Sequence, residues 1–321
     1  MTGVLEKANR AKRAYLACVG LESRVKDKAL NAIANALVAS KKRILEANKL
    51  DLQAAAKAGL PDALIARLKL SGEKIDAMAL GVRSVARLSD PVGRTLQSTE
   101  LDKNLILYKV STSIGVIGFI FESRPDVVAQ IASLSLKYGN SVILKGGSEA
   151  LHSNRVLCEV IEKASAEAGI PKGWIQLLES RRDVEEMLSM NGLIDLIIPR
   201  GSKQLVEHIQ KNSRIPVLGH AEGICHAFVD RDADLKKAVK VCHDAKVQYP
   251  AVCNAIETLL VDGNIAKEFL PEIARDYEKA GVELRVDEKS RKILKDFNTK
   301  KAVEADWTTE YGDLIISIKV V

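Results

Sequence analysis

A continuous apolar run from Ile114 to Phe121 constrains the fold of this chain most strongly. Such a run is typical of a parallel strand that is covered on both faces. Val127 to Tyr138 follows with helical periodicity, and Asn140 to Leu144 forms a second short apolar run. The order strand, helix, strand predicts a parallel sheet built by right-handed crossover, and therefore an α/β fold.

The residues before this sheet predict helices. From about Leu5 to Leu88 apolar residues recur at helical spacing, with lysines and arginines on the other faces. Breaks are expected at Gly20, Gly59-Leu60-Pro61 and Ser71-Gly72. Asn104 to Val110 then alternates as a strand does, so residues 95–112 are a candidate oligomerisation hairpin.

Two glycine-containing turns follow predicted buried strands. Lys145-Gly146-Gly147-Ser148-Glu149-Ala150 leads into a predicted helix from His152 to Ala168, and the strand Asp195 to Ile198 leads into Pro199-Arg200-Gly201-Ser202-Lys203. Glycine lets the backbone approach a ligand closely, and helix N-termini attract anions. A plain strand-to-helix turn explains either segment equally well by itself. Two such turns with basic neighbours favour a dinucleotide lying across a sheet edge.

Cys253 lies in the stretch Gln248 to Thr258, after a proline turn and directly before the apolar run Leu259-Leu260-Val261. The thiol is therefore expected in a loop that leads into a buried strand. There it can act as a nucleophile if its pKa is lowered. Taken alone, the residue fits better as one more buried small apolar side chain. The rest of the chain must decide between these interpretations.

Composition limits the class of protein. A chain of 321 residues, 47% hydrophobic, is long enough for two domains, which we expect at 1–225 and 226–321. Five cysteines without paired spacing predict free thiols and a cytoplasmic protein. No apolar run is long enough for a signal peptide or a membrane span. The net charge of +6 is spread over interspersed basic and acidic residues with few aromatics, which argues against a nucleic-acid partner.

A metal site is disfavoured by spacing. The candidate ligands are His220, Cys225, His226, Cys242 and His243. None of them forms a CxxC, HxxxH or HExxH pair, and adjacent residues on a strand point to opposite faces. We therefore expect no metal.

Several segments together resemble the aldehyde dehydrogenase superfamily, and specifically its members that reduce an acyl phosphate in proline biosynthesis. The similarity covers essentially the whole chain. The segments that carry it are Asp90-Pro91-Val92-Gly93-Arg94, Gly115-Val116-Ile117-Gly118, Glu122-Ser123-Arg124-Pro125, Lys145 to Ala150, Glu222 to His226, Val252-Cys253-Asn254-Ala255, Asp306-Trp307 and Thr309-Glu310-Tyr311. The resemblance implies a Rossmann-type cofactor domain followed by a second α/β catalytic domain. It also implies reduction of L-glutamyl 5-phosphate by NADPH, and a homodimer or higher homo-oligomer.

The resemblance also implies roles for single residues. Cys253 matches the superfamily's nucleophile and would form a thioacyl enzyme that hydride reduces. Arg124 stands where relatives carry an oxyanion-hole asparagine, so we assign it, with Asn254, to the acyl phosphate substrate. The implied cofactor-binding residues are Lys145, Gly146, Gly147, Ser148, Glu149, Arg200, Gly201, Ser202 and Glu310. Ser148 replaces an acid that reads a ribose 2'-hydroxyl, which favours NADP over NAD.

Two departures from the superfamily pattern matter. Val217-Leu218-Gly219-His220 stands where hydrolytic members carry a general-base glutamate, so the thioacyl group is expected to exchange with phosphate and not with water. His220 is a candidate substitute base or a structural residue. The resemblance further implies a longer chain, because the sequence stops inside the predicted strand Ile315 to Val321, with the C-terminal part of the catalytic domain missing. A cofactor-binding remnant without turnover, and an aldehyde dehydrogenase of another substrate, are the alternative functions.

Overall fold

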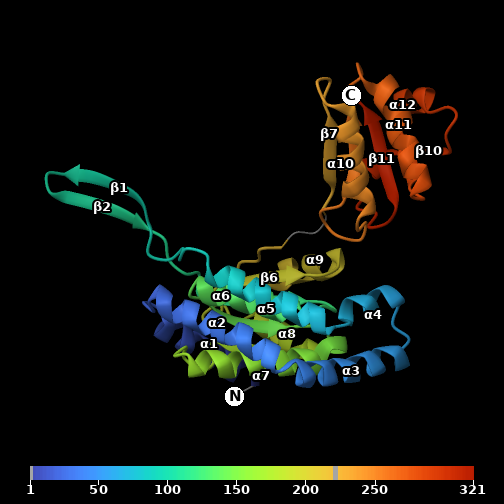
Figure 1. Ribbon diagram of the computed structural model, residues 1–321. Coiled ribbons are helices and arrows are strands. Elements are labelled where there is room, and N and C mark those ends of the chain that lie inside the picture. The colour runs from blue at the N-terminus through green and yellow to red at the C-terminus, as the bar shows by residue number, and fades with distance from the viewer. Residues whose placement is uncertain (1–2, 220–222) are drawn as a thin grey trace. The chain divides into compact units, whose positions relative to one another are not determined.

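The computed structural model describes residues 3–219 and 223–321, which form two compact units. Unit 1 extends to residue 220 and unit 2 begins at residue 221. Each unit contains a parallel sheet with its own apolar core. The α/β fold predicted from the sequence is therefore confirmed (Figure 1).

The sheet of unit 1 has four parallel strands in the order β5-β4-β3-β6. Its strands are β3 (Val116–Phe121), β4 (Ser141–Lys145), β5 (Ile175–Leu178) and β6 (Leu196–Arg200). The chain moves outward from β3 through β4 to β5 and then returns to the other side of β3. In sheets of this kind ligands bind at the carboxyl ends of the strands, where the direction of winding changes.

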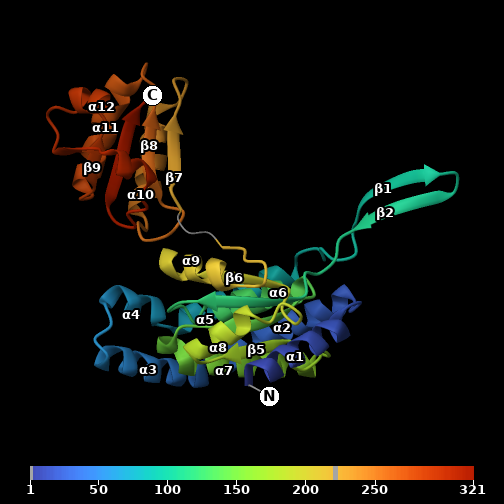
Figure 2. The ribbon, with the colours of Figure 1, turned by 180° about the vertical axis from the view of Figure 1, so that it is seen from behind.

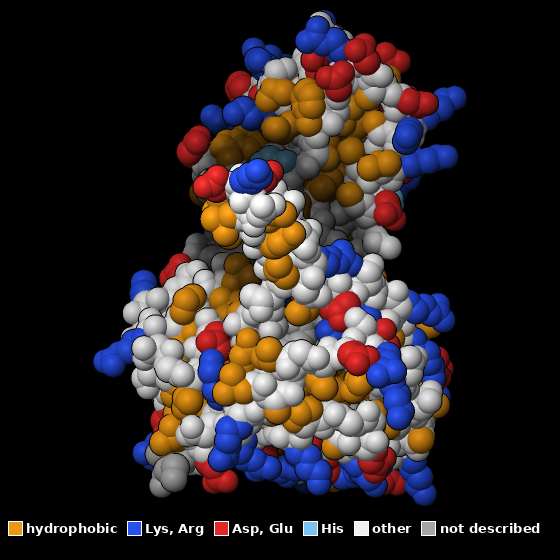
Figure 3. All heavy atoms as spheres, turned by 90° about the vertical axis from the view of Figure 1, so that its left-hand side faces the viewer, with side chains coloured by type: hydrophobic (Ala, Val, Ile, Leu, Met, Phe, Trp, Pro, Cys, Tyr) orange, Lys and Arg blue, Asp and Glu red, His pale blue; other side chains and the backbone are white. Residues whose placement is uncertain are grey.

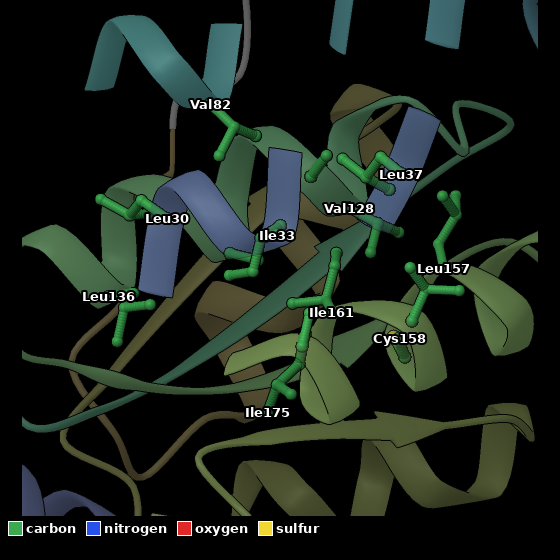
Figure 4. Close-up of a cluster of buried hydrophobic side chains, with 14 of the residues drawn as sticks. Leu30, Ile33, Leu37, Val82, Val128, Leu136, Leu157, Cys158, Ile161 and Ile175 are labelled. Carbon is green, nitrogen blue, oxygen red and sulfur yellow. The ribbon is translucent and has the colours of Figure 1, made fainter. Parts of the chain in front are cut away.

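Helices cover both faces of this sheet (Figures 1 and 2). The helices of unit 1 are α1 (Gly3–Cys18), α2 (Ser23–Ala39), α3 (Lys41–Lys57), α4 (Asp62–Leu68), α5 (Gly72–Ala86), α6 (Val127–Lys137), α7 (Leu151–Glu167), α8 (Arg181–Leu188) and α9 (Lys203–Asn212). Of these, α2 to α5 pack mainly on other helices. Side chains on alternate positions of the strands enter different cores, as strand geometry requires. Phe121 and Leu144 join the core under α2, α5, α6 and α7, part of which Figure 4 shows. Ile120 and Ile143 join the core under α1 and α8.

The helical region before the sheet is confirmed, with one break that the sequence did not indicate. Gly20, the Gly59 to Pro61 segment and Ser71 each lie between helices. Ser40 also separates two helices, α2 and α3, although no glycine or proline marks the place. Both helices pack on α7, so tertiary packing accounts for this bend. None of the helices in the described ranges combines the length and apolar character of a bilayer span.

An antiparallel hairpin interrupts unit 1 between α5 and β3. It consists of β1 (Thr95–Asp102) and β2 (Leu105–Val110), as the sequence predicted. Every residue of both strands is exposed. The exposed apolar side chains are Leu96, Leu101, Leu105, Ile106, Leu107, Tyr108 and Val110. Figure 3, viewed from the side that carries the hairpin, shows apolar side chains at the surface among charged ones.

Unit 2 contains a parallel sheet in the order β10-β9-β11-β8-β7. Its elements are β7 (Cys225–Val229), α10 (Leu235–Val247), β8 (Ile256–Val261), α11 (Ala266–Lys279), β9 (Glu283–Val286), α12 (Glu288–Ile293), β10 (Thr299–Lys301) and β11 (Ile315–Val320). The last strand, β11, pairs with β8 on one side and with β9 on the other.

Candidate active site

Three segments leave the sheet of unit 1 at its carboxyl edge. The segment after β3 begins with Glu122, and the two glycine-containing turns follow Lys145 of β4 and Arg200 of β6. The strand register aligns them, because Ile120 lies opposite Lys145 and Phe121 lies opposite Arg200. The two predicted turns therefore share one edge and flank the segment that carries Arg124.

Lys145 is a buried cation at this edge, with 6% of its surface exposed. Its ammonium donates a hydrogen bond to the backbone oxygen of Gly146 at 2.5 Å. Burial lowers the pKa of Lys145, while the carboxylates of Glu149 and Asp183 act in the opposite direction. Since a buried cation is costly unless its donors are satisfied, the two remaining N–H groups are suited to an anionic or hydroxyl-bearing ligand.

Glu149 contacts the neighbouring segment rather than pointing only to solvent. One of its oxygens, Oε1, accepts hydrogen bonds from the backbone N–H of Ser123 at 2.8 Å and from the Ser123 hydroxyl at 2.6 Å. Burial acts to raise the pKa of Glu149, but these hydrogen bonds outweigh it and the pKa lies below its ordinary value. Glu149 is therefore ionised at neutral pH and joins the first turn to the segment after β3.

Arg124 follows Ser123 and is half exposed. Its guanidinium donates to the Asp126 carboxylate at 3.1 Å, and Asp126 also accepts from Gln130 at 3.4 Å. An arginine has five N–H donors, so one carboxylate partner leaves donors for a phosphate. The structure thus places Arg124 at the same edge as the two turns.

The second turn, after β6, brings Arg200, Gly201 and Ser202 to that edge. Arg200 is exposed, and Gly201 lies against the Glu122 side chain, which a Cβ at residue 201 would meet at 2.8 Å. The Ser202 hydroxyl accepts from the backbone N–H of Leu205 at 3.4 Å and so caps helix α9. A capped helix N-terminus beside a cation favours a negatively charged ligand.

In unit 2, Cys253 occupies an exposed loop between α10 and β8. Three other cysteines, Cys18, Cys158 and Cys242, are buried. Burial raises the pKa of Cys18 to about 11 and that of Cys242 to about 11, which keeps both thiols protonated and unreactive. Cys253 is therefore not one more buried apolar residue, and its neighbour Asn254 is exposed as well.

The backbone of the Cys253 loop is held by two residues that precede or begin β7. The Cys225 thiol donates to the Cys253 carbonyl oxygen at 3.4 Å. Gly223 packs so closely that a Cβ there would lie 2.4 Å from the same oxygen. Only glycine permits this approach, so Gly223 helps to set the position of the thiol.

Glu310 belongs to the same group in unit 2. Its Oε2 accepts a hydrogen bond from the backbone N–H of Gly223 at 2.8 Å. The chain of contacts Glu310, Gly223, Cys253 thus brings together two residues that the sequence assigned to the site.

A buried ion pair connects the strand that follows Cys253 with the loop that follows Glu310. Lys246 of α10 donates to Oε2 of Glu257 at 2.7 Å, and their side chains are 0% and 1% exposed. The other oxygen, Oε1, accepts from the backbone N–H of Gly312 at 3.1 Å. Glu257 therefore joins the strand after Cys253 to the loop after Glu310.

Sequence reasoning missed Ser123, Asp126, Gly223 and the Lys246–Glu257 pair as parts of these arrangements. A signal was present for one of them, since Glu257 is a charged residue in a strand whose other residues, apart from Thr258, are apolar. His220 lies outside the described residues. Within residues 3–219 and 223–321, no three histidines, cysteines or acids group as metal ligands would.

The sequence and the fold of this chain match a known family. The model of the aldehyde dehydrogenase family covers residues 4–292. A glyceraldehyde-3-phosphate dehydrogenase from Methanocaldococcus jannaschii, solved in complex with NADP, shares the fold with a TM-score of 0.66 at 20% identity, over 99% of this chain and 75% of that one. The chain is a member of the aldehyde dehydrogenase family, whose solved relatives include nicotinamide-cofactor enzymes.

Relatives of higher identity narrow the assignment. Gamma-glutamyl phosphate reductase from Methanococcoides burtonii is 53% identical over 100% of this chain and 73% of its own length. The crystal structure of gamma-glutamyl phosphate reductase from Thermotoga maritima superposes with a TM-score of 0.93 at 43% identity, over 99% of this chain and 77% of that one. Within its family, the chain belongs with the gamma-glutamyl phosphate reductases.

Proposed function

We propose that this chain reduces L-glutamyl 5-phosphate to L-glutamate 5-semialdehyde and inorganic phosphate with NADPH, in proline biosynthesis. The observation that carries the proposal is the exposed Cys253 loop, which is held by Gly223 and Cys225. The chain that contains this loop is 53% identical to a gamma-glutamyl phosphate reductase. A reactive thiol on a loop anchored by a sheet is the arrangement that nucleophilic catalysis needs.

The reaction proceeds in two steps at Cys253. The thiolate sulfur attacks the acyl carbon, the carbon–oxygen bond to phosphate breaks, and phosphate leaves. A reduced nicotinamide, when bound, would supply the hydride that reduces the carbon of the resulting thioester. The carbon–sulfur bond then breaks, which releases the aldehyde and regenerates the thiolate. The backbone N–H of Cys253 is the donor that stabilises the oxyanion in both steps.

Arg124 and Asn254 are the proposed substrate-binding residues. The guanidinium of Arg124 suits a phosphate because planar paired donors match its oxygens. The fixed positive charge stabilises the phosphate as negative charge develops on the leaving group. The side chain of Asn254 is exposed beside the nucleophile and offers both a donor and an acceptor to the acyl group.

The proposed cofactor-binding residues are those of the two turns, together with Glu310. The buried ammonium of Lys145, which has a backbone partner for one of its three donors, fits the hydroxyls and phosphates of a dinucleotide. Gly146, Gly147, Arg200, Gly201 and Ser202 allow its phosphates to approach the backbone and a helix N-terminus. Ser148 in place of an acid avoids repulsion of a 2'-phosphate, which favours NADP. The proposed cofactor-binding domain is 1–225 and the proposed catalytic domain, which contributes Glu310, is 226–321.

The absence of a carboxylate in Val217-Leu218-Gly219-His220 supports phosphate exchange in place of hydrolysis. Water attacks a thioester slowly unless a base removes its proton. All five cysteines are free thiols, which fits the reducing cytoplasm as the proposed location.

The decisive experiment is the reverse reaction. We expect this chain to reduce NADP with glutamate 5-semialdehyde only when inorganic phosphate is present, and to use NAD less well. The measurement is absorbance of the reduced cofactor, with and without phosphate and with either cofactor. Turnover without phosphate identifies an aldehyde dehydrogenase that makes the acid. Cofactor binding without turnover, in a sample of the correct mass, identifies a binding protein instead.

We also propose that the β1–β2 hairpin binds a second copy of this chain. A two-stranded hairpin is marginally stable alone, and its exposed apolar residues need a partner surface.

Replacing Ile106 and Leu107, one from each face, with lysine is expected to convert a dimer or larger assembly into monomers. The measurement is molar mass by light scattering. Leu80→Lys, at an exposed leucine of α5, is the control and keeps the wild-type mass. A monomeric wild-type chain contradicts the proposal.

A further inference from the structure

We propose that Glu149 is a positioning residue for the phosphate contact: by holding Ser123 in a left-handed backbone conformation, it sets the direction in which Arg124 is presented. The inference rests on the proposed function, because it takes Arg124 as the residue that binds the substrate's phosphate. It adds a role for Glu149 beyond the cofactor.

Ser123 has an uncommon conformation for its residue type. Its φ is 39°, and Ser123 and Asn104 are the non-glycine residues with positive φ in the described ranges. Asn104 lies at the exposed hairpin turn, where such values are ordinary, whereas Ser123 is 4% exposed at the carboxyl edge of the sheet. For a residue other than glycine, a backbone conformation with positive φ costs free energy, and it persists only when surrounding groups impose it.

The carboxylate of Glu149 is the group that imposes it. Both donors of Ser123, its backbone N–H and its hydroxyl, point to the same oxygen at 2.8 and 2.6 Å. Hydrogen bonds to an ionised acceptor are the stronger kind. Gly147 makes room for this arrangement, because a Cβ there would lie 1.9 Å from that oxygen.

The conformation of Ser123 matters because Arg124 is held on its other side as well. Pro125 restricts the backbone of Arg124 to extended values, and the Arg124 carbonyl accepts from the N–H of Val127 at the start of α6 at 3.2 Å. The guanidinium is directed by Asp126. The backbone conformation of Ser123 therefore sets the direction of the chain between β3 and Arg124, and the hydrogen bonds to Glu149 hold that conformation. A guanidinium that is held in place before the phosphate binds increases both the affinity for phosphate and the rate of the reaction.

The test uses the Michaelis constant for inorganic phosphate in the reverse reaction, since that constant reports on the Arg124 contact. Glu149→Ala removes the acceptor and is expected to raise the KM for phosphate about tenfold. Glu149→Gln keeps an acceptor oxygen and is expected to stay within about threefold of wild type. Glu167→Ala, at an exposed glutamate of α7, is the matched control and leaves the constant unchanged.

A rescue variant separates this role from a general loss of structure. Glycine adopts positive φ without cost, so adding Ser123→Gly to Glu149→Ala is expected to restore most of the phosphate affinity. Should Glu149→Ala fail to fold, Ser123→Ala loses one of the two hydrogen bonds and is expected to raise the KM for phosphate about threefold.

Two outcomes overturn the inference: a Glu149→Ala enzyme whose NADP affinity falls while its KM for phosphate is unchanged, and a double variant that is no better than Glu149→Ala. Failure of the proposed function has a different signature, because the wild-type chain would then show no phosphate-dependent reduction of NADP at all.

Discussion

Cys253→Ser is expected to lower turnover by at least about a thousandfold, because a serine hydroxyl without a base is a far weaker nucleophile than a thiolate. The thiol is exposed and belongs to no core, so the variant should keep the wild-type thermal stability. Binding of NADPH should also be unchanged, since the residues proposed to hold the cofactor are intact. Cofactor reduction in the reverse direction and NADPH fluorescence are the two measurements.

The control is Cys18→Ser, which changes a thiol whose pKa burial raises to about 11. This variant should keep wild-type turnover, with a loss of stability as its only effect, because it places a hydroxyl beside an apolar core. Retained turnover in Cys253→Ser would remove the thioacyl mechanism. Loss of turnover in both variants would show that the effect is not specific to the nucleophile.

Lys246→Met is expected to lower the free energy of unfolding of unit 2 by about 3–5 kcal/mol, because it leaves the Glu257 carboxylate buried without its partner. The double variant Lys246→Met with Glu257→Gln should recover at least about 1–2 kcal/mol, since the uncompensated charge is gone while Gly312 keeps its acceptor. Urea unfolding of the three proteins measures both effects.

Lys240→Met provides the matched control on the same helix. Lys240 is exposed, so its loss should change stability by no more than about 0.5 kcal/mol. A Lys246→Met protein as stable as the control would show that the pair contributes nothing to the fold. Because Glu257 also contacts Gly312, the single variant should disturb the loop that carries Glu310 together with stability.

The elements themselves were largely predictable from the sequence. The buried strands β3 and β4, the helices around them, the exposed hairpin and the loop of Cys253 all follow from apolar periodicity and from glycine and proline turns. These signals are local, because each depends on residues within one or two turns of helix or a few positions of strand. The break at Ser40 escaped prediction since no local residue causes it.

The arrangement of the candidate site was predictable only in part. Parallel strands place their carboxyl ends at one edge, so the two glycine-containing turns were expected together. The roles of individual residues depended on the resemblance to a family, because spacing alone left Cys253 and both turns ambiguous. The assignment of Glu149 to the cofactor did not anticipate its hydrogen bonds to Ser123.

The sequence by itself thus determined the kind of elements, their order along the chain and the residue types available for chemistry. Only the tertiary structure decided which of them touch. Ser123 meets Glu149 across 26 positions, and Gly223 meets both the Cys253 carbonyl and the Glu310 carboxylate, the latter from 87 positions further along the chain. Such contacts depend on how strands and helices pack, and packing is set by the whole core and not by the neighbours of any one residue.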